Sequence, residues 1–250
     1  MTAIRHVLAR ALLVGGALAV VLWCWATLPS FWLVTGPSDV SERILADDRF
    51  QPGKLNEFLM RIKSRPQPVL FQSAFLRSEA LIQLRVAEEA IVRASPAEAD
   101  REAARAENNI KLALSLNPTD AFLWLMLYSE ETTRSGLTSN NIAHLERSYQ
   151  AGPNEGWIAL RRNRVALGAF SILGAELQNA VVLEFAALVD SEFFQDAELS
   201  LISAGWASRD RLLAGLAQVD IRPRKGFAKL LSGHAVGVKV PGIMEDPRPW

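Results

Sequence analysis

Residues 113–125 read ALSLNPTDAFLWL, and this stretch decides the fold. An apolar helical pattern runs to Leu116, and Asn117-Pro118 stops it, because proline disfavours helical geometry in the residue before it and cannot donate the next backbone hydrogen bond. Thr119 or Asp120 then caps a second apolar helix. The sequence therefore predicts two helices joined by a tight turn.

The same plan recurs further along the chain. A cap at Thr138 or Ser139 precedes a helical pattern that ends at Ala-Gly-Pro, with Pro153 about 35 residues after Pro118. A helix–turn–helix unit of this length cannot bury its apolar face alone, so neighbouring units stack and build a concave surface. This spacing predicts a helical repeat.

Helical periodicity covers most of the remaining chain, with little strand signal. A Ser95-Pro96 start, with Glu98 in the first turn, is the clearest helix beginning. We expect an all-α protein with helices near 39–47, 54–64, 71–94, 95–116, 154–171, 174–189, 191–204 and 208–219.

Composition excludes several classes of function. The chain has 250 residues, half of them hydrophobic, and equal numbers of basic and acidic residues, 27 each. That balance argues against a nucleic-acid partner. The single cysteine, Cys24, permits no intrachain disulfide, and His6, His144 and His234 lack ligand spacing. No phosphate loop, nucleophile elbow or zinc-protease motif is present, so we expect no cofactor, no metal and no enzymatic activity.

The N-terminal segment predicts a membrane anchor. Ala11 to Leu28 is uncharged and nearly all apolar, which suffices to cross a bilayer as a helix that bends or ends at Pro29. The apolar run is longer than that of a cleaved signal peptide. Cations precede it and acids follow it, which places the N-terminus in the cytoplasm and the rest in the periplasm of a bacterial inner membrane. The lipid bilayer is then one partner.

The region around Pro118 resembles the tetratricopeptide repeat. Ala106 and Ala113 match its small packing positions, Pro118 its final proline, and Trp124 and Leu127 the opening of the next repeat. The chain departs from that pattern where Tyr128 replaces a glycine and Glu131 an aromatic residue. The resemblance implies a hairpin-repeat domain, "tetratricopeptide-like", that mediates protein–protein interactions.

The whole layout also resembles small membrane-anchored proteins of bacterial exopolysaccharide assembly, the VpsP-like group. The similar features are an N-terminal span, the repeat at 113–125, and the RVALGAF helix at 164–170. This likeness implies envelope or polysaccharide-assembly proteins as partners.

Candidate partner-binding residues lie in the repeat and in the C-terminal tail. Arg161, Arg162 and Arg164 would supply cations to a groove that binds an acidic peptide or an anionic saccharide. Tyr128 could stack on such a ligand, whereas Trp124 and Trp157 are expected in the core.

The tail 221–250 contains four prolines, six cations and two acids. It is expected either to drape over the surface or to dock on a partner through Phe227, Leu230 and Leu231.

An enzymatic alternative rests on acidic side chains. Asp190 and Glu192, with Asp196 and Glu198 nearby, could supply paired carboxylates for glycan chemistry. Acids at a helix start are more often solvated and favoured by the helix dipole, and we prefer that interpretation. Glu130 and Glu131, late in their helix, and His144, on a short polar helix, are also expected at the surface.

The sequence thus predicts four parts: a cytoplasmic tip and anchor at 1–36, a juxtamembrane helical linker at 37–69, a tetratricopeptide-like domain at 70–220, and a basic tail at 221–250. The expected function is a periplasmic scaffold in a cell-envelope assembly, which could be one that makes or exports exopolysaccharide. The alternatives are a glycan-active enzyme and an anionic-saccharide-binding module.

Overall fold

The computed structural model describes residues 2–64 and 73–244, and every regular element in these ranges is helical. The expectation of an all-α fold is therefore confirmed. The α-helices are α1 (Thr2–Leu45), α2 (Lys54–Lys63), α3 (Ser73–Arg93), α4 (Pro96–Leu116), α5 (Ala121–Ser135), α6 (Ser139–Ala151), α7 (Gly156–Gly168), α8 (Ala175–Asp190), α9 (Phe194–Ile202), α10 (Arg209–Gly215) and α11 (Ile221–Gly233). Three 3-10 turns, η1 (Phe170–Ile172), η2 (Trp206–Ser208) and η3 (Leu216–Gln218), connect the later helices.

The chain forms two compact units, Met1–Asn117 and Pro118–Trp250. The division falls at the Asn-Pro stop, inside the stretch 70–220 that the sequence predicts as a single repeat domain. The predicted boundary between linker and repeat domain, at residues 69 and 70, lies outside the described residues, as do Pro66, Pro68 and the last six residues of the tail.

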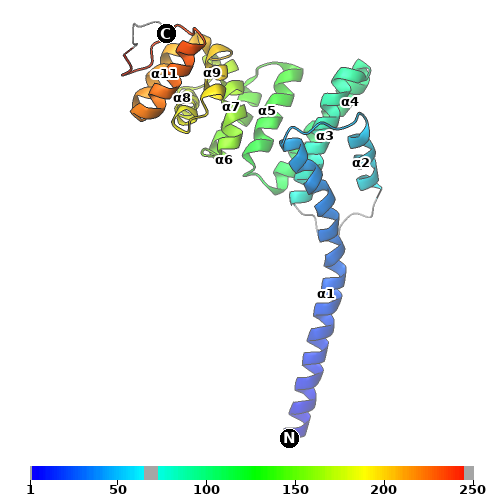
Figure 1. Ribbon diagram of the computed structural model, residues 1–250. Helices are drawn as coiled ribbons and strands as arrows, with labels where there is room; N and C mark the ends of the chain where they lie inside the picture. The colour runs from blue at the N-terminus through cyan, green and yellow to red at the C-terminus, as the bar shows by residue number, and fades with distance from the viewer. Residues whose placement is uncertain (1, 65–72, 245–250) are drawn as a thin grey trace. The chain divides into compact units, whose positions relative to one another are not determined.

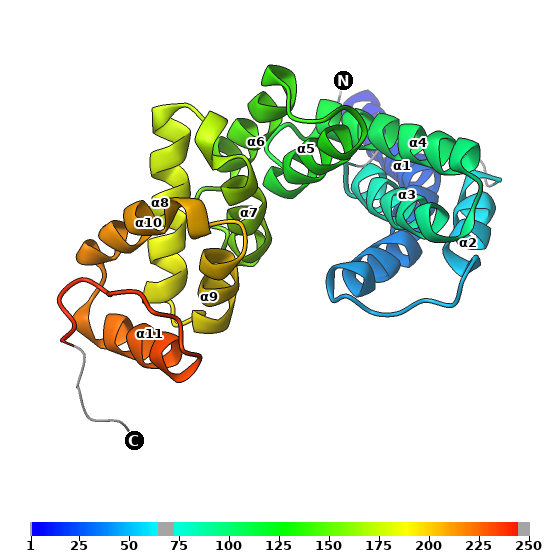
Figure 2. The ribbon, with the colours of Figure 1, turned by 90° about the horizontal axis from the view of Figure 1, so that it is seen from above.

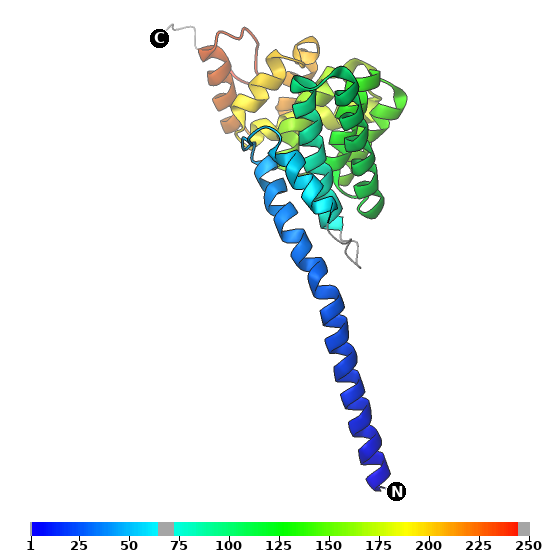
Figure 3. The ribbon, with the colours of Figure 1, turned by 90° about the vertical axis from the view of Figure 1, so that its right-hand side faces the viewer.

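Helix α1 is longer than the sequence predicts. It continues past Pro29 to Leu45. The prediction that the helix ends at Pro29 is therefore wrong, and so is the prediction of a separate helix at 39–47. A proline removes one backbone hydrogen bond, and the bonds of the flanking turns can carry a long helix through that loss. In Figures 1 and 3, the N-terminal part of α1 extends away from α2, α3 and α4.

The other end of α1 packs into the first unit. Leu55 and Leu59 of α2 and Ile82 and Val86 of α3 are buried together, and Val40, Ile44, Phe50 and Phe58 pack against them. Ser41 of α1 also lies within 3.1 Å of Ser78 of α3, oxygen to oxygen, in a buried hydrogen bond. Helices α3 and α4 form an antiparallel hairpin that completes this unit (Figure 1).

The predicted caps are present in the second unit. The Asp120 carboxylate accepts a hydrogen bond of 3.0 Å from the backbone N–H of Leu123, and the Thr138 hydroxyl accepts one of 3.3 Å from that of Asn141. Helix α5 therefore begins three residues after Pro118, and α6 ends at the Gly152-Pro153 stop. Local chemistry fixes these boundaries.

Helices α5 and α6 form a close hairpin. A Cβ at Gly152 would stand 2.7 Å from the Cβ of Ala121, so only glycine permits this approach of the two helices. The Ser148 hydroxyl donates to the Ala121 carbonyl at 2.8 Å across the same contact. The Ala-Gly-Pro stop thus serves packing as well as helix termination.

Helix α8 is the centre of the second unit. It contacts α6, α7, α9, α10 and α11, and Figure 2 shows it next to α10 in the second unit. Helix α11 is a folded part of this unit, because Phe227 is fully buried against Phe185 of α8 and Phe194 of α9. The predicted tail therefore begins with a packed helix, and an irregular segment follows it.

The sequence predicts that the N-terminal helix crosses a membrane. Within the part of the chain that the structure describes, no helix has the combined length and apolar character needed to cross a membrane.

Candidate functional site

The structure separates the predicted partner-binding residues by burial. Tyr128, Arg162 and Phe227 are buried, Arg161 is half-buried and Arg164 is exposed. The surface location predicted for Arg162 is wrong, and the same holds for Tyr128 and Phe227, because each is packed within the second unit. Partner contact by Arg161 or Arg164 stays a prediction.

Arg162 is the centre of a buried polar network. Its exposed fraction is 0%, and its Nη2 lies 2.6 Å from Oε1 of Glu184 on α8. Its Nε donates to the same oxygen at 3.0 Å, Nη1 donates to the Ser148 carbonyl at 2.7 Å, and Nη2 donates to the Gly152 carbonyl at 3.0 Å. The guanidinium thus ties α8 to the end of α6, where it bonds to the Gly152 carbonyl just after the helix and is a second donor to the Ser148 carbonyl, which already accepts from the Gly152 N–H.

Tyr149 closes this network. Its ring lies 4.1 Å from the Arg162 guanidinium carbon, and its hydroxyl donates to Oε2 of Glu184 at 2.6 Å. Burial raises the pKa of Tyr149 well above its ordinary value, and the Glu184 charge raises it further. Burial also raises the pKa of Glu184, although Arg162 opposes that effect. We interpret the network as an internal brace.

One feature of the sequence indicates this network, although it is not among the expectations above: the isolated charge of Glu184. Glu184 is the only charge between Glu176 and Asp190, in the otherwise apolar run VVLEFAALV. An isolated charge in a helix that is apolar all round must be buried, and a buried charge requires a partner.

Two acids of the enzymatic alternative, Asp190 and Glu192, lie at the C-terminal end of α8 and not at a helix start as expected, whereas Asp196 and Glu198 lie on α9. Glu192 has a positive φ of 63°, the Phe193 N–H bonds to the Leu188 carbonyl at 2.9 Å, and the Glu192 N–H bonds to the Val189 carbonyl at 3.1 Å. This is the Schellman arrangement that ends helices, usually with glycine at the position of Glu192. The positive φ of Glu192 is therefore explained by the way α8 ends, without any catalytic role for this residue.

A surface cluster surrounds His144. Its ring stacks on Trp124 with centroids 5.5 Å apart, and its Nε2 lies 3.2 Å from Oε2 of Glu131. Trp124 is half-buried and donates from Nε1 to the Pro118 carbonyl at 2.8 Å. Trp157 is 38% exposed, so the core position predicted for it is only partly reached, through its contact with Phe122.

A second carboxylate–imidazole pair lies at the end of α11. Nδ1 of His234 is 2.7 Å from Oε1 and 2.9 Å from Oε2 of Glu198, which is buried on α9. The two residues are 36 positions apart, so sequence spacing gave no sign of this pair. The contact fixes the end of α11 to α9.

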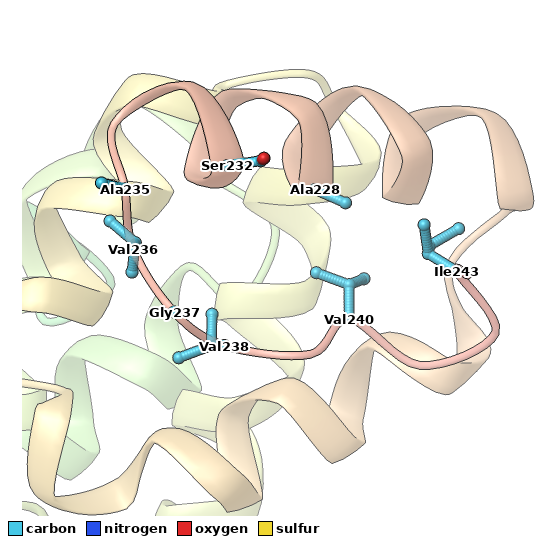
Figure 4. Close-up of a pocket in the computed structure, with 8 residues that line it drawn as sticks. All are labelled: Ala228, Ser232, Ala235, Val236, Gly237, Val238, Val240 and Ile243. Carbon is cyan, nitrogen blue, oxygen red and sulfur yellow. The ribbon is translucent and has the colours of Figure 1, made fainter. Parts of the chain in front are cut away.

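Next to this pair is a small hollow of about 270 Å³. Figure 4 shows Ala228 and Ser232 of α11 on one side and Val236, Val238, Val240 and Ile243 of the following segment on the other. The lining is mainly aliphatic with one hydroxyl. In residues 2–64 and 73–244, no three His, Cys, Asp or Glu side chains gather in a way that could hold a metal ion.

Comparisons of the chain with family models, with curated proteins and with solved structures found no match.

Proposed function

We propose that the protein is a membrane-anchored scaffold, in which α1 holds the chain in a bacterial inner membrane and the helical hairpins bind other proteins of a cell-envelope assembly. The observation that carries the proposal is the surface of α1. Its exposed apolar side chains are Leu12, Leu13, Val14, Leu18, Val20, Val21, Leu22, Trp23, Trp25 and Leu28.

Such a surface is unfavourable in water. Trp25 is 80% exposed, and each apolar side chain of this size gains about 1.5–3 kcal/mol when it leaves water. An uninterrupted apolar surface on a soluble chain marks an interaction site. Lipid covers all sides of a helix at once, which suits α1 because the exposed residues occur at consecutive positions.

The scaffold part of the proposal is supported by architecture. Helices α3–α4 and α5–α6 are hairpins, the element from which tetratricopeptide-like domains are built. Arg164, exposed on α7, and Arg161 beside it are cations that could pair with carboxylates of a partner. The assembly could be one that makes or exports exopolysaccharide, as the layout of the chain suggests.

The test is an in vivo crosslinking experiment with the full chain, followed by affinity capture and mass spectrometry. We expect envelope proteins to be captured, and we expect Arg164→Glu to reduce their yield several-fold while Arg147→Glu, an exposed control on α6, does not. Capture of no envelope protein, together with unchanged surface glycans after loss of the gene, would reject the scaffold function.

A further inference from the structure

Helix α11 has two faces of opposite character. Pro223, Phe227 and Leu231 are buried, whereas Arg222, Lys225 and Lys229 are exposed. At 100° per residue, the three cations cluster about 190° from the middle of the buried face. The packing of Phe227 on α8 and α9 therefore fixes α11 with its basic face outward.

The side chains of the three cations of this basic face make no hydrogen bond or ion pair with the residues that the structure describes. Lys239, in the segment after α11, is exposed as well. The sequence contains no Asp or Glu between Asp220 and Glu245. The face is therefore a local concentration of positive charge on a chain whose formal net charge is zero.

Two exposed apolar side chains lie at the start of α11 and in the segment that follows it. Arg224 donates from Nη1 to the Pro241 carbonyl at 2.8 Å, and Gly242 lies against the same guanidinium, which holds the C-terminal segment to the first half of α11. Ile221, at the start of α11, is 46% exposed, and Met244, at the end of that segment, is 96% exposed.

We propose that the basic face of α11, together with the exposed side chains Ile221 and Met244, binds the anionic headgroups of the membrane surface. Cations together with nearby apolar side chains suit an anionic lipid–water interface. The one aromatic residue of α11, Phe227, is buried, so no aromatic ring of this helix is exposed beside the three cations. This disfavours a sugar ligand, since sugars usually stack on aromatic rings. The inference rests on the proposed anchoring by α1, which keeps the second unit close to lipid.

The test uses the full chain incorporated into vesicles of phosphatidylcholine alone or of phosphatidylcholine and phosphatidylglycerol in equal parts. The measured quantity is the rate of acetylation at Lys225 and Lys229, by mass spectrometry, with Lys54 of α2 as the internal reference. Each cation near an anionic surface strengthens binding about fivefold. We therefore expect acetylation of both lysines to slow at least about fivefold on the anionic vesicles.

Two controls separate charge from other causes. Raising the salt to about 0.5 M shortens the screening length to roughly 4 Å and should restore the rate. Arg222→Glu should remove most of the protection while leaving both reporter lysines in place, whereas Arg147→Glu on α6 should not.

The possible outcomes are distinct. Incorporation with equal lysine reactivity on both kinds of vesicle would overturn the α11 contact and leave the anchor intact. Protection by soluble polyaspartate on neutral vesicles, with none from anionic lipid, would overturn the lipid assignment in favour of a soluble polyanion. A chain that does not float with either vesicle would overturn the anchor, and with it the basis of this inference.

Discussion

Arg162 is the residue whose burial most constrains the second unit. Its guanidinium bonds to Glu184 and to the Ser148 and Gly152 carbonyls at the end of α6, so its loss leaves a buried carboxylate without its charge partner and the Gly152 carbonyl without this donor. We predict that Arg162→Met lowers the free energy of unfolding by about 3–5 kcal/mol. Chemical denaturation followed by circular dichroism measures this change.

The double variant Arg162→Met, Glu184→Leu supplies the control. It removes both charges and should recover a large part of the loss, because replacing a whole buried ion pair is often close to neutral. A single variant that costs less than about 1 kcal/mol would show that the network is not the brace we infer.

The two tyrosines of the chain predict alkaline instability. Burial raises the pKa of Tyr128 and, together with Glu184, that of Tyr149. A raised pKa means that the folded state retains its proton after the unfolded chain has lost it, so stability is full below pH 10 and falls as the pH rises above it. Tyr149, whose pKa is raised the more strongly, should contribute a slope of up to about 1.4 kcal/mol per pH unit, and Tyr128 adds a slope of the same sign.

Tyr149→Phe should therefore make the fall of the unfolding free energy above pH 10 less steep, apart from a constant loss due to the hydrogen bond to Glu184. Tyr128→Phe is the matched comparison and should reduce the slope as well, by no more than Tyr149→Phe does. An unchanged slope in both variants would show that neither hydroxyl titrates differently in the folded chain.

Three helices end in a backbone conformation that is uncommon for residues other than glycine. Asp47, Glu192 and Ala235 occupy positive φ values of 57°, 63° and 57° in Schellman turns after α1, α8 and α11. Side chains other than glycine cost about 1 kcal/mol in this conformation. These ends hold because the flanking hydrogen bonds fix the turn.

Glu192→Gly should accordingly raise the free energy of unfolding by about 1 kcal/mol, less a few tenths for the greater freedom of glycine in the unfolded chain. Glu192→Ala removes the carboxylate but keeps the Cβ, so it should change stability by less than about 0.5 kcal/mol. Equal effects of both substitutions would assign the change to the carboxylate instead of the backbone.

Elements whose ends depend on local chemistry could be predicted from the sequence, and contacts between distant residues could not. Asp120, Thr138 and the Asn-Pro stop act on backbone groups within three or four residues, so α4, α5 and α6 begin and end where expected. The continuation of α1 past Pro29 could not be predicted from the sequence. Proline disfavours helical geometry locally, and the hydrogen bonds of the turns on either side outweigh that local effect.

The candidate site shows the same limit. The burial of Arg162 depends on Glu184, 22 positions away, and the pairing of His234 depends on Glu198. An arginine in a run such as LRRNR is usually solvated, so only the three-dimensional packing distinguishes Arg162 from Arg164.

At the scale of the whole molecule, the apolar surface of α1 is the feature that most needs a partner. If α1 lies in a bilayer, charge in its middle is costly: each arginine adds about 2.5–3.5 kcal/mol to insertion. We predict that Leu18→Arg, Val21→Arg moves the chain from the membrane to the soluble fraction or leads to its degradation. Leu116→Arg, an equally apolar exposed position on α4, should leave its distribution unchanged.

The most direct measurement of the central claim is alkaline carbonate extraction of bacterial membranes that carry the full chain, combined with protease treatment of spheroplasts. We predict that the chain remains in the membrane pellet after extraction and that external protease removes the region after α1 while the segment around Leu12 to Leu28 stays protected. Recovery of the intact chain in the soluble supernatant, untouched by external protease, would contradict a membrane-anchored scaffold.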